Sequence, residues 1–268
     1  MRMHAEKDFD GRLFCEAATH LLDRLQHLTL PFHIIGDLSP AHTPGAEAVA
    51  RRQRPHSHIR RLSITDAAET RFDVLYSPLA LHWEEDPLAY LTKAHQMLAP
   101  GGLLLLNFWG GHTLAKLRQC LAEADFTLHG VVYPRILPMI RLEEATRLMG
   151  QTPFRLTVAD RDDFILHYDS FHSLTRHLKR MGEGNALQGR ATHPPAKGFW
   201  PHVKRLYKQH HHDKTSSRTK KGLTVEAELI TLTGWKEGPG LPQPLKRGSA
   251  THSLETAVSS PGSSLQST

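Results

Sequence analysis

Hydrophobic and polar positions alternate along this chain in blocks that predict strands and helices in turn. Apolar residues recur every three or four positions across 13–28, the period of an amphipathic helix, and Pro31 ends it. Continuous apolar runs at 32–38 and 72–77 predict buried strands, and 58–64 predicts a weaker one. A turn at Ser39-Pro40 and a helix near 46–53 are expected between the first two strands.

The next block has clear boundaries. A helix is predicted over 86–98, with Pro87 in its first turn, and Pro100-Gly-Gly102 is expected to stop it before a strand over 103–108. Another helix is predicted over 113–124. Strands that alternate with helices favour a parallel sheet covered on both faces and wound right-handed, so the predicted fold class is α/β and Rossmann-like.

Beyond Phe126 the pattern changes. A loop is expected at 133–138, and helices are predicted at 142–149, 171–181 and 199–209. Between the first two helices, an extended stretch over 154–168 is expected to turn at 160–163. The pattern over 223–235 predicts a final strand. We therefore expect one domain over 1–236, with an inserted helical cap over 133–221. Residues 237–268 are rich in Gly, Pro, Ser and Thr and predict a disordered tail.

Composition narrows the class of protein. A chain of 268 residues with 39% apolar composition can bury one sizeable core. Its two cysteines, Cys15 and Cys120, lack the number and spacing of a disulfide framework or zinc site, and the adjacent histidines 210–212 cannot all face one ion, so no metal is expected. The longest apolar run, 102–110, covers about half of the ~20 residues that a membrane span needs.

Charge and the N-terminal pattern bear on partners and compartment. The net charge is +6, but the basic residues are scattered apart from 214–221, so we predict no nucleic-acid site. The first ten residues contain acids and no apolar segment of the kind found in signal peptides. A cytoplasmic location is expected, or the mitochondrial matrix if the source is eukaryotic.

Two stretches resemble a known superfamily. Arg71-Phe-Asp-Val-Leu-Tyr-Ser-Pro-Leu-Ala-Leu-His-Trp83, followed by Leu98-Ala-Pro-Gly-Gly-Leu-Leu-Leu-Leu106, is similar to the fourth strand, the following helix and the fifth strand of class I S-adenosylmethionine-dependent methyltransferases. The resemblance implies a Rossmann-like sheet and S-adenosylmethionine as cofactor.

Four shorter motifs narrow the resemblance, which spans roughly 8–236. They are Leu-His-Trp83, Phe108-Trp-Gly-Gly111 running into Thr113-Leu-x-x-Leu-Arg118, Met181-Gly-Glu-Gly-Asn-Ala186, and Leu232-Thr-Gly-Trp235. These motifs resemble the methyltransferases of biotin synthesis that act on malonyl carrier protein, and even more the related assembly factors of respiratory complex I. The resemblance implies a protein partner, either a carrier protein or a respiratory complex subunit.

The chain departs from the family at the glycine-rich motif. Where the family has Asp-Leu-Gly-Cys-Gly-Thr-Gly, this sequence has Gly36-Asp-Leu-Ser-Pro40. Measured from the preceding helix, Asp37 takes the place of that motif's aspartate. Measured back from Phe72, it matches the acid of the second strand, which usually binds the ribose hydroxyls. The distance to Phe72 favours the second register, so we predict a deleted strand-helix unit and a sheet one strand short.

The resemblance implies five cofactor-binding residues. Gly36 and Asp37 would contact the ribose or methionine moiety, Asp66 would meet the adenine amine after the third strand, and Ser77 and Leu79 would line the pocket floor. The alternative for Asp37 and Asp66 is a purely structural role in a turn or helix cap.

Three further side chains are substrate-pocket candidates. His82, Trp83 and Trp109 follow predicted strands and could wall the site, although large residues at such positions, including Phe108, also commonly belong to the core. The sequence identifies no catalytic residue, and methyl transfer from a sulfonium needs none because it depends chiefly on positioning and exclusion of water.

Three functions remain open. The first is a methyltransferase that acts on a carboxylate or other nucleophile of a protein-bound substrate. The second is a complex I assembly factor, since members of that family have been assigned arginine hydroxylation of a subunit. The third is a scaffold that keeps the methyltransferase fold and has lost cofactor binding, as the altered glycine motif suggests.

Overall fold

The computed structural model describes most of the chain: residues 2–4, 12–26, 28, 32–40, 56–66, 70–181, 184–185, 187–211, 223–239 and 241. The helix predicted near 46–53 and nearly all of the tail predicted over 237–268 lie outside the described residues. Within the described part, no helix has the length and apolar character that crossing a membrane requires.

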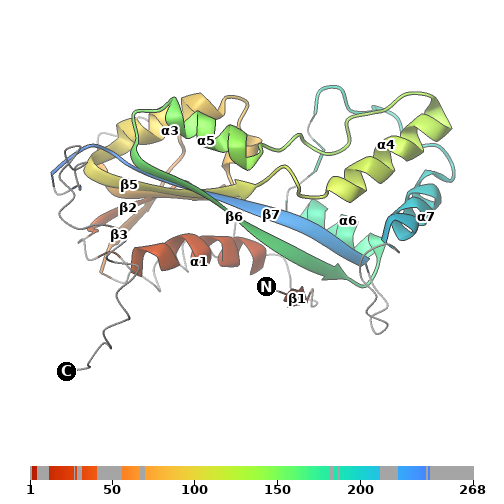
Figure 1. Cartoon of the computed structure of the whole chain (residues 1–268), viewed down its shortest axis with the longest axis horizontal. Helices are drawn as coiled ribbons and strands as arrows, with labels where there is room; N and C mark the ends of the chain where they lie inside the picture. The colour runs from red at the N-terminus through yellow and green to blue at the C-terminus, as the bar shows by residue number, and fades with distance from the viewer. Residues whose placement is uncertain are drawn as a thin grey trace, which may run out of the picture.

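One twisted sheet organises the molecule (Figure 1). Its strand order is β1-β6-β7-β5-β4-β2-β3, and β7 is antiparallel to both of its neighbours. The strands are β1 (Arg2–His4), β2 (Ile34–Asp37), β3 (His58–Arg61), β4 (Phe72–Pro78), β5 (Leu98–Trp109), β6 (Arg155–Tyr168) and β7 (Leu223–Trp235). The α/β Rossmann-like fold predicted from the sequence is therefore present.

The position of β2 fits both registers of Asp37. Strand β2 lies directly beside β4, with Ile35 opposite Val74 and Asp37 opposite Tyr76, and β3 pairs with its other edge. In the order 3-2-1-4 of a Rossmann sheet, loss of either the first or the second strand leaves the other one between the third and the fourth. A single strand between β3 and β4 therefore agrees with the predicted sheet that is one strand short, and the register of Asp37 stays a prediction.

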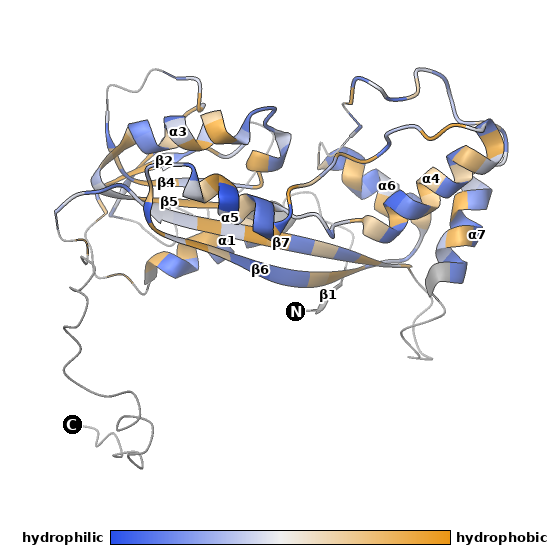
Figure 2. Cartoon of the chain, turned by 45° about the horizontal axis from the view of Figure 1, so that its top comes forward, coloured by the Kyte–Doolittle hydropathy of each residue, from blue (hydrophilic) through white to orange (hydrophobic). Residues whose placement is uncertain are grey.

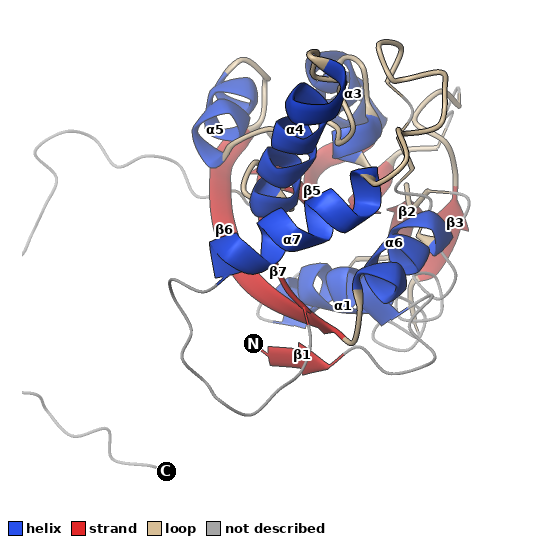
Figure 3. Ribbon diagram, turned by 90° about the vertical axis from the view of Figure 1, so that its right-hand side faces the viewer, coloured by secondary structure: helices blue, strands red, loops and turns tan. Residues whose placement is uncertain are grey.

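Helices cover both faces of the sheet, and α1 (Arg12–Gln26) lies on the face opposite α3 (Pro87–Met97) and α5 (Leu142–Gly150) (Figure 1). The helices α4 (Ala115–His129), α6 (Phe171–Arg180) and α7 (Phe199–His211) gather at one end, as seen in Figure 3. Apolar stripes on these helices, visible in Figure 2, alternate with polar ones, as expected for helices that bury a single face.

The core has three parts. Under α1, the side chains of Leu21, Leu22 and Leu25 pack with Ile35 and Val74 of the sheet. On the opposite face, residues of α3 and α5 pack on β4 and β5. The third part joins α4, α6 and α7 to β6 and β7, so these helices form a cap with a core of its own.

Strand β6 corrects two expectations. It runs without a turn from Arg155 to Tyr168, whereas a turn was expected at 160–163. The acids that suggested the turn are instead paired with α1: Arg24 binds Asp160 at 2.7 Å and 3.0 Å, and His20 lies 3.0 Å from Asp162. The segment 133–221, where a helical cap was expected, is not helical throughout, because it contains β6 and also α5, which packs on the sheet. The described helices of the cap within that segment are α6 and α7.

Candidate functional site

Strands β2 and β4 end side by side, at Asp37 and Pro78. From these ends the chain leads in opposite directions across the sheet, to β3 on one side and to β5 on the other. In open α/β sheets, ligands bind in the crevice outside the carboxyl ends of the strands at such a switch point. The C-terminal ends of β2 and β4 are therefore the first place to look for a site.

Asp37 is fully buried at this crevice. Its Oδ1 accepts a hydrogen bond from the backbone N–H of Ser39 at 2.8 Å, which forms a local turn. Three buried oxygens lie together here: Oδ2 of Asp37, Oγ of Ser39 and the hydroxyl of Tyr76. The Tyr76 hydroxyl interacts with the side chains of both Asp37 and Ser39, so the three form one buried polar group at the strand end.

Two tyrosine hydroxyls adjoin Asp37. Burial, and then the negative charge of Asp37, raise the pKa of Tyr76 above its usual value. Burial also raises the pKa of Tyr90, whose hydroxyl lies 2.7 Å from Oγ of Ser77. Both tyrosines therefore stay protonated and uncharged at neutral pH, and they surround Asp37 with neutral hydroxyl groups.

The turn after β4 has an unusual backbone. Leu79 has a φ of +52°, a conformation that non-glycine residues adopt at a cost of about 1–3 kcal/mol. Its N–H donates to the carbonyl and to the side-chain Oδ1 of Asn107, at 2.9 Å and 3.1 Å. The leucine side chain is fully buried and belongs to the apolar cluster of the cap, and its place on the floor of a cofactor pocket stays a prediction.

Two of the predicted cofactor residues have simple structural roles. A side chain at Gly36 would collide with Leu75 and Phe72, so packing within the sheet already requires glycine there. Asp66 is exposed, and its Oδ2 accepts from the backbone N–H of Ser63 at 2.8 Å within a tight turn. Both contacts fit the structural alternative, and a role for either residue in binding a cofactor stays a prediction.

The substrate-pocket candidates separate into two places. His82 and Trp83 lie in the short 3-10 helix Leu81–Trp83 directly after the Leu79 turn, with ring centroids 5.7 Å apart; His82 is buried and Trp83 is partly buried. Trp109 ends β5 and lines a cavity under the cap. Phe108 is fully buried, which agrees with the alternative that it belongs to the core.

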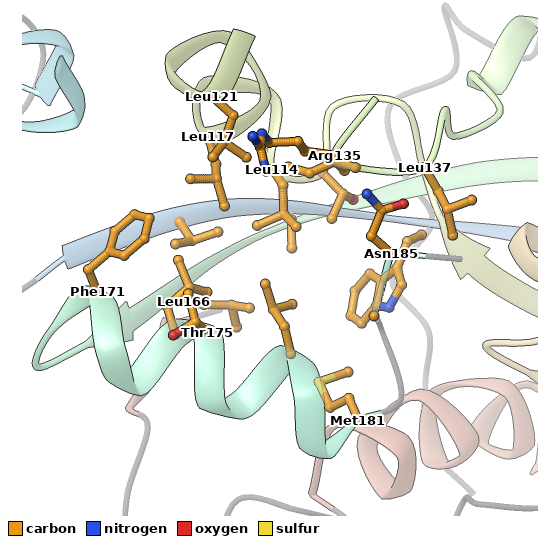
Figure 4. A pocket seen from close by; sticks show the side chains of 18 of the residues that line it. Leu114, Leu117, Leu121, Arg135, Leu137, Leu166, Phe171, Thr175, Met181 and Asn185 are labelled. Atoms are coloured by element: carbon orange, nitrogen blue, oxygen red, sulfur yellow. The ribbon is translucent and has the colours of Figure 1, made fainter. Parts of the chain in front are cut away.

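The cavity has a volume of about 250 Å³ (Figure 4). Its walls come from α4, α6 and the strands β6 and β7, with Leu117, Leu174 and Leu166 as examples. Trp109, which lines the cavity, belongs with Leu79 to one apolar cluster, and the strands β5 and β4 that lead to these residues are neighbours.

Sequence reasoning missed several of these residues. Asn107 interrupts the apolar run 103–109, and a lone polar residue within a buried strand was an available signal. Tyr90 lies on the buried face of a correctly predicted helix, where nothing distinguishes it from other core residues. The cavity residues are far apart in the sequence, from Trp109 to Ala227, and only the fold brings them together.

Comparison with known proteins agrees with this arrangement. Residues 28–106, which contain both strand ends of the crevice, match the family described as "Methyltransferase domain". The predicted resemblance to methyltransferases is confirmed. Among the described residues, no group of three or more His, Cys, Asp or Glu is placed to hold a metal ion.

Two groups of curated relatives are similar to this chain. A malonyl-[acyl-carrier protein] O-methyltransferase of Xylella fastidiosa is 38% identical over 133 residues, which cover 50% of this chain and 42% of that protein. The mitochondrial arginine-hydroxylase NDUFAF5 of Danio rerio is 29% identical over 182 residues, 68% of this chain and 55% of that protein. The chain thus spans about half the length of the relatives it matches.

Solved structures give a more distant likeness. The YcgJ protein of Bacillus subtilis has a TM-score of 0.48 at 10% identity, covering 83% of this chain and 99% of that one. The fold assignment rests on the strand order of the sheet itself.

Proposed function

We propose that this chain is an S-adenosylmethionine-dependent methyltransferase that acts on a protein-bound or carboxylate substrate. One observation carries the proposal: Asp37, Ser39 and Tyr76 bring three buried polar oxygens together at the switch point of the sheet. These residues lie within the segment that matches the methyltransferase domain. The proposed partner that presents the substrate is a carrier protein or a respiratory complex subunit, and the proposed compartment is the cytoplasm or mitochondrial matrix.

The residues present fit the polar parts of this cofactor. Oδ2 of Asp37 can accept hydrogen bonds from hydroxyl or ammonium groups, and the Ser39 hydroxyl can donate or accept. The carboxylate also supplies the negative charge that a positively charged ligand prefers. Leu79, fully buried beside them, would contact an apolar part of the ligand. The fit therefore does not depend on the missing glycines of the family motif.

The chemistry requires little else from the protein. When bound, S-adenosylmethionine supplies an electrophilic methyl group on a positively charged sulfur. The protein must align the acceptor with that methyl group and exclude water. The apolar side chains of Leu79 and Trp109, both buried, would keep the adjoining region dry. His82 and Trp83, which follow the Leu79 turn, remain the proposed contacts to the acceptor.

The test is calorimetric titration of the full chain with S-adenosylmethionine and S-adenosylhomocysteine. Asp37→Asn keeps the acceptor for the Ser39 N–H but replaces the other carboxylate oxygen, so we expect at least a tenfold loss of affinity. Asp163→Asn is the control, because Asp163 is 65% exposed on β6, away from this strand end, and it should bind like the wild type. A folded wild-type chain that binds neither compound at millimolar concentration would overturn the proposal and favour the scaffold.

A second candidate function is arginine hydroxylation of a complex I subunit. The observation in its favour is the extent of the match, because the arginine-hydroxylase relative aligns with 68% of this chain against 50% for the carrier-protein methyltransferase. Mass spectrometry of reacted substrates separates the two. Addition of a methylene to a carrier-bound acid supports methyl transfer, whereas addition of one oxygen to an arginine-containing peptide supports hydroxylation.

A further inference from the structure

The cavity under the cap is lined mainly by apolar side chains. Helix α4 contributes Leu117 and Leu121, α6 contributes Leu174 and Leu178, and the sheet contributes Leu166 and Val225. In Figure 4 the labelled leucines surround a common space, with Arg135 along the side that carries Leu114 and Leu117, and Asn185 between Arg135 and Leu137. The walls are thus mainly flexible aliphatic side chains, and polar groups are few.

Among the described residues of the lining, Arg135 is the one charged side chain, and it is neutralised within the protein. Arg135 donates from Nε and Nη2 to the carboxylate of Asp125, both at 2.6 Å, and Asp125 is fully buried. The guanidinium also lies over the ring of Phe199, with its central carbon 4.3 Å from the centroid. Because Arg135 is already paired, it adds little attraction for an anion, and the cavity suits an uncharged group.

The volume sets the size of the occupant. A cavity of about 150 Å³ lined by aliphatic and aromatic residues binds benzene, which has six non-hydrogen atoms. In proportion, the cavity of about 250 Å³ accommodates roughly ten non-hydrogen atoms. An apolar group of this size gains affinity with every methylene that it buries.

We propose that this cavity binds an unbranched aliphatic chain of about eight to ten carbons, which forms the apolar part of the methyl acceptor. Its polar end lies toward Trp109, where β5 ends next to the Leu79 turn and the polar crevice. The role of this aliphatic chain as part of the methyl acceptor rests on the proposed function. The binding of an aliphatic chain as such rests only on the cavity.

The test uses straight-chain alcohols as probes, followed by the fluorescence of the tryptophans and by calorimetry. Trp109 and Trp200 both line the cavity and should report its occupation. Affinity should rise about fourfold per methylene from n-butanol to n-octanol and stop rising before n-dodecanol. Absence of n-octanol binding up to its solubility limit would overturn the proposal, as would tenfold tighter binding of 2-naphthol, a rigid aromatic compound of similar size.

Two variants change the cavity in opposite directions. Ala227→Leu fills it from β7 and should weaken n-octanol binding at least tenfold without lowering the melting temperature. Leu117→Ala enlarges it from α4, so n-dodecanol should then bind more tightly than n-octanol. The matched control is Leu128→Ala on the same helix, because Leu128 is 39% exposed and outside the lining; its chain-length profile should be unchanged.

The alcohol titrations contain no S-adenosylmethionine, so their result is separate from the cofactor test. Binding of n-octanol by a chain that does not bind the cofactor would support the cavity site and overturn the proposed methyl transfer. Binding of the cofactor without binding of n-octanol would support the proposed methyl transfer and overturn the cavity site. If folded Leu117→Ala kept the preference of the wild type for the length of the alcohol, this result would also contradict the binding of the aliphatic chain in this cavity.

Discussion

The side chain of Asn107 joins the turn at Leu79 to helix α1. Its Oδ1 accepts from the Leu79 N–H at 3.1 Å, and its Nδ2 donates to the carbonyl of Ala17 at 2.9 Å. Asn107 is fully buried, and it lies opposite Pro78 in the pairing of β4 with β5. One amide thus holds the left-handed turn that separates the polar crevice from the apolar cavity.

Replacing this amide should lower stability. In Asn107→Leu, the carbonyl of Ala17 loses its side-chain donor inside the core, and we expect the free energy of unfolding to fall by roughly 1–3 kcal/mol. Urea denaturation followed by circular dichroism measures the change. Gln119→Leu on the exposed side of α4 should change it by less than about 0.5 kcal/mol, and an equal loss in both variants would contradict this role of Asn107.

The glycine after β5 should also be irreplaceable. A Cβ at Gly110 would lie 2.7 Å from the carboxyl group of Glu228 and from Ile230. Glu228 is buried and accepts from the backbone N–H of His112 at 2.8 Å, so it has little freedom to move. We expect Gly110→Ala to cost about 1–3 kcal/mol in thermal or urea unfolding.

Gly150 offers a matched control for that substitution. It ends α5, and a Cβ built on it meets nothing within 4 Å. Gly150→Ala should therefore leave stability unchanged or raise it by up to about 1 kcal/mol, because alanine is the better helix former. Equal destabilisation by both alanine substitutions would mean that the close approach to Glu228 is not what requires Gly110.

The sequence was sufficient for most of the fold because its strands and helices have strong local signals. The final strand was predicted over 223–235, as found in β7, and Pro87 correctly marked the start of α3. The expected turn at 160–163 failed because the acids there are paired with Arg24 and His20 of α1, contacts that no local pattern reveals.

The candidate site was predictable only in part. Asp37, Ser77 and Leu79 follow from their positions at the ends of predicted strands, and the structure places all three at or beside the crevice. The contribution of Tyr90 depends on how α3 packs on β4, and the cavity depends on contacts between segments more than a hundred residues apart in sequence, such as Trp109 and Ala227. Such contacts are a property of the tertiary fold.

Alkaline pH should destabilise the protein. Burial raises the pKa of the Cys120 thiol to about 11, and the charge of Glu123 adds to the shift; burial likewise raises the pKa of Tyr168 and Tyr207. These groups are neutral when protonated, so above pH ~9 the unfolded chain loses protons that the folded chain keeps, and the free energy of unfolding falls as pH rises.

Two measurements check this expectation. Urea unfolding should show lower stability at pH 10.5 than at pH 8, and tyrosinate absorbance should increase sharply on unfolding at the higher pH. Cys120→Ala removes the thiol that titrates, so part of the decrease between the two pH values should disappear. Stability that is constant or rises over this range would show that these groups are not buried as described.

The ion pair of Arg135 with Asp125 should contribute more to the stability of the protein than the exposed ion pairs do. The side chain of Asp125 is fully buried and that of Arg135 is 15% exposed, so removing one partner leaves a buried charge. Asp125→Ala or Arg135→Ala should each cost about 3–5 kcal/mol, measured by urea unfolding. The exposed pair of Arg161 and Asp163, 3.4 Å apart, is the control, and Asp163→Ala should cost no more than ~1 kcal/mol.

The double variant separates the charge from the packing. With Asp125→Leu and Arg135→Met together, no buried charge is left uncompensated, so the loss of stability should be smaller than the sum of the losses for the two single substitutions. Additive losses would mean that each side chain contributes independently and that the pair is not coupled. Because Arg135 also lines the cavity, n-octanol should bind the folded double variant at least as tightly as the wild type, since methionine replaces a charged group of the lining by an apolar one.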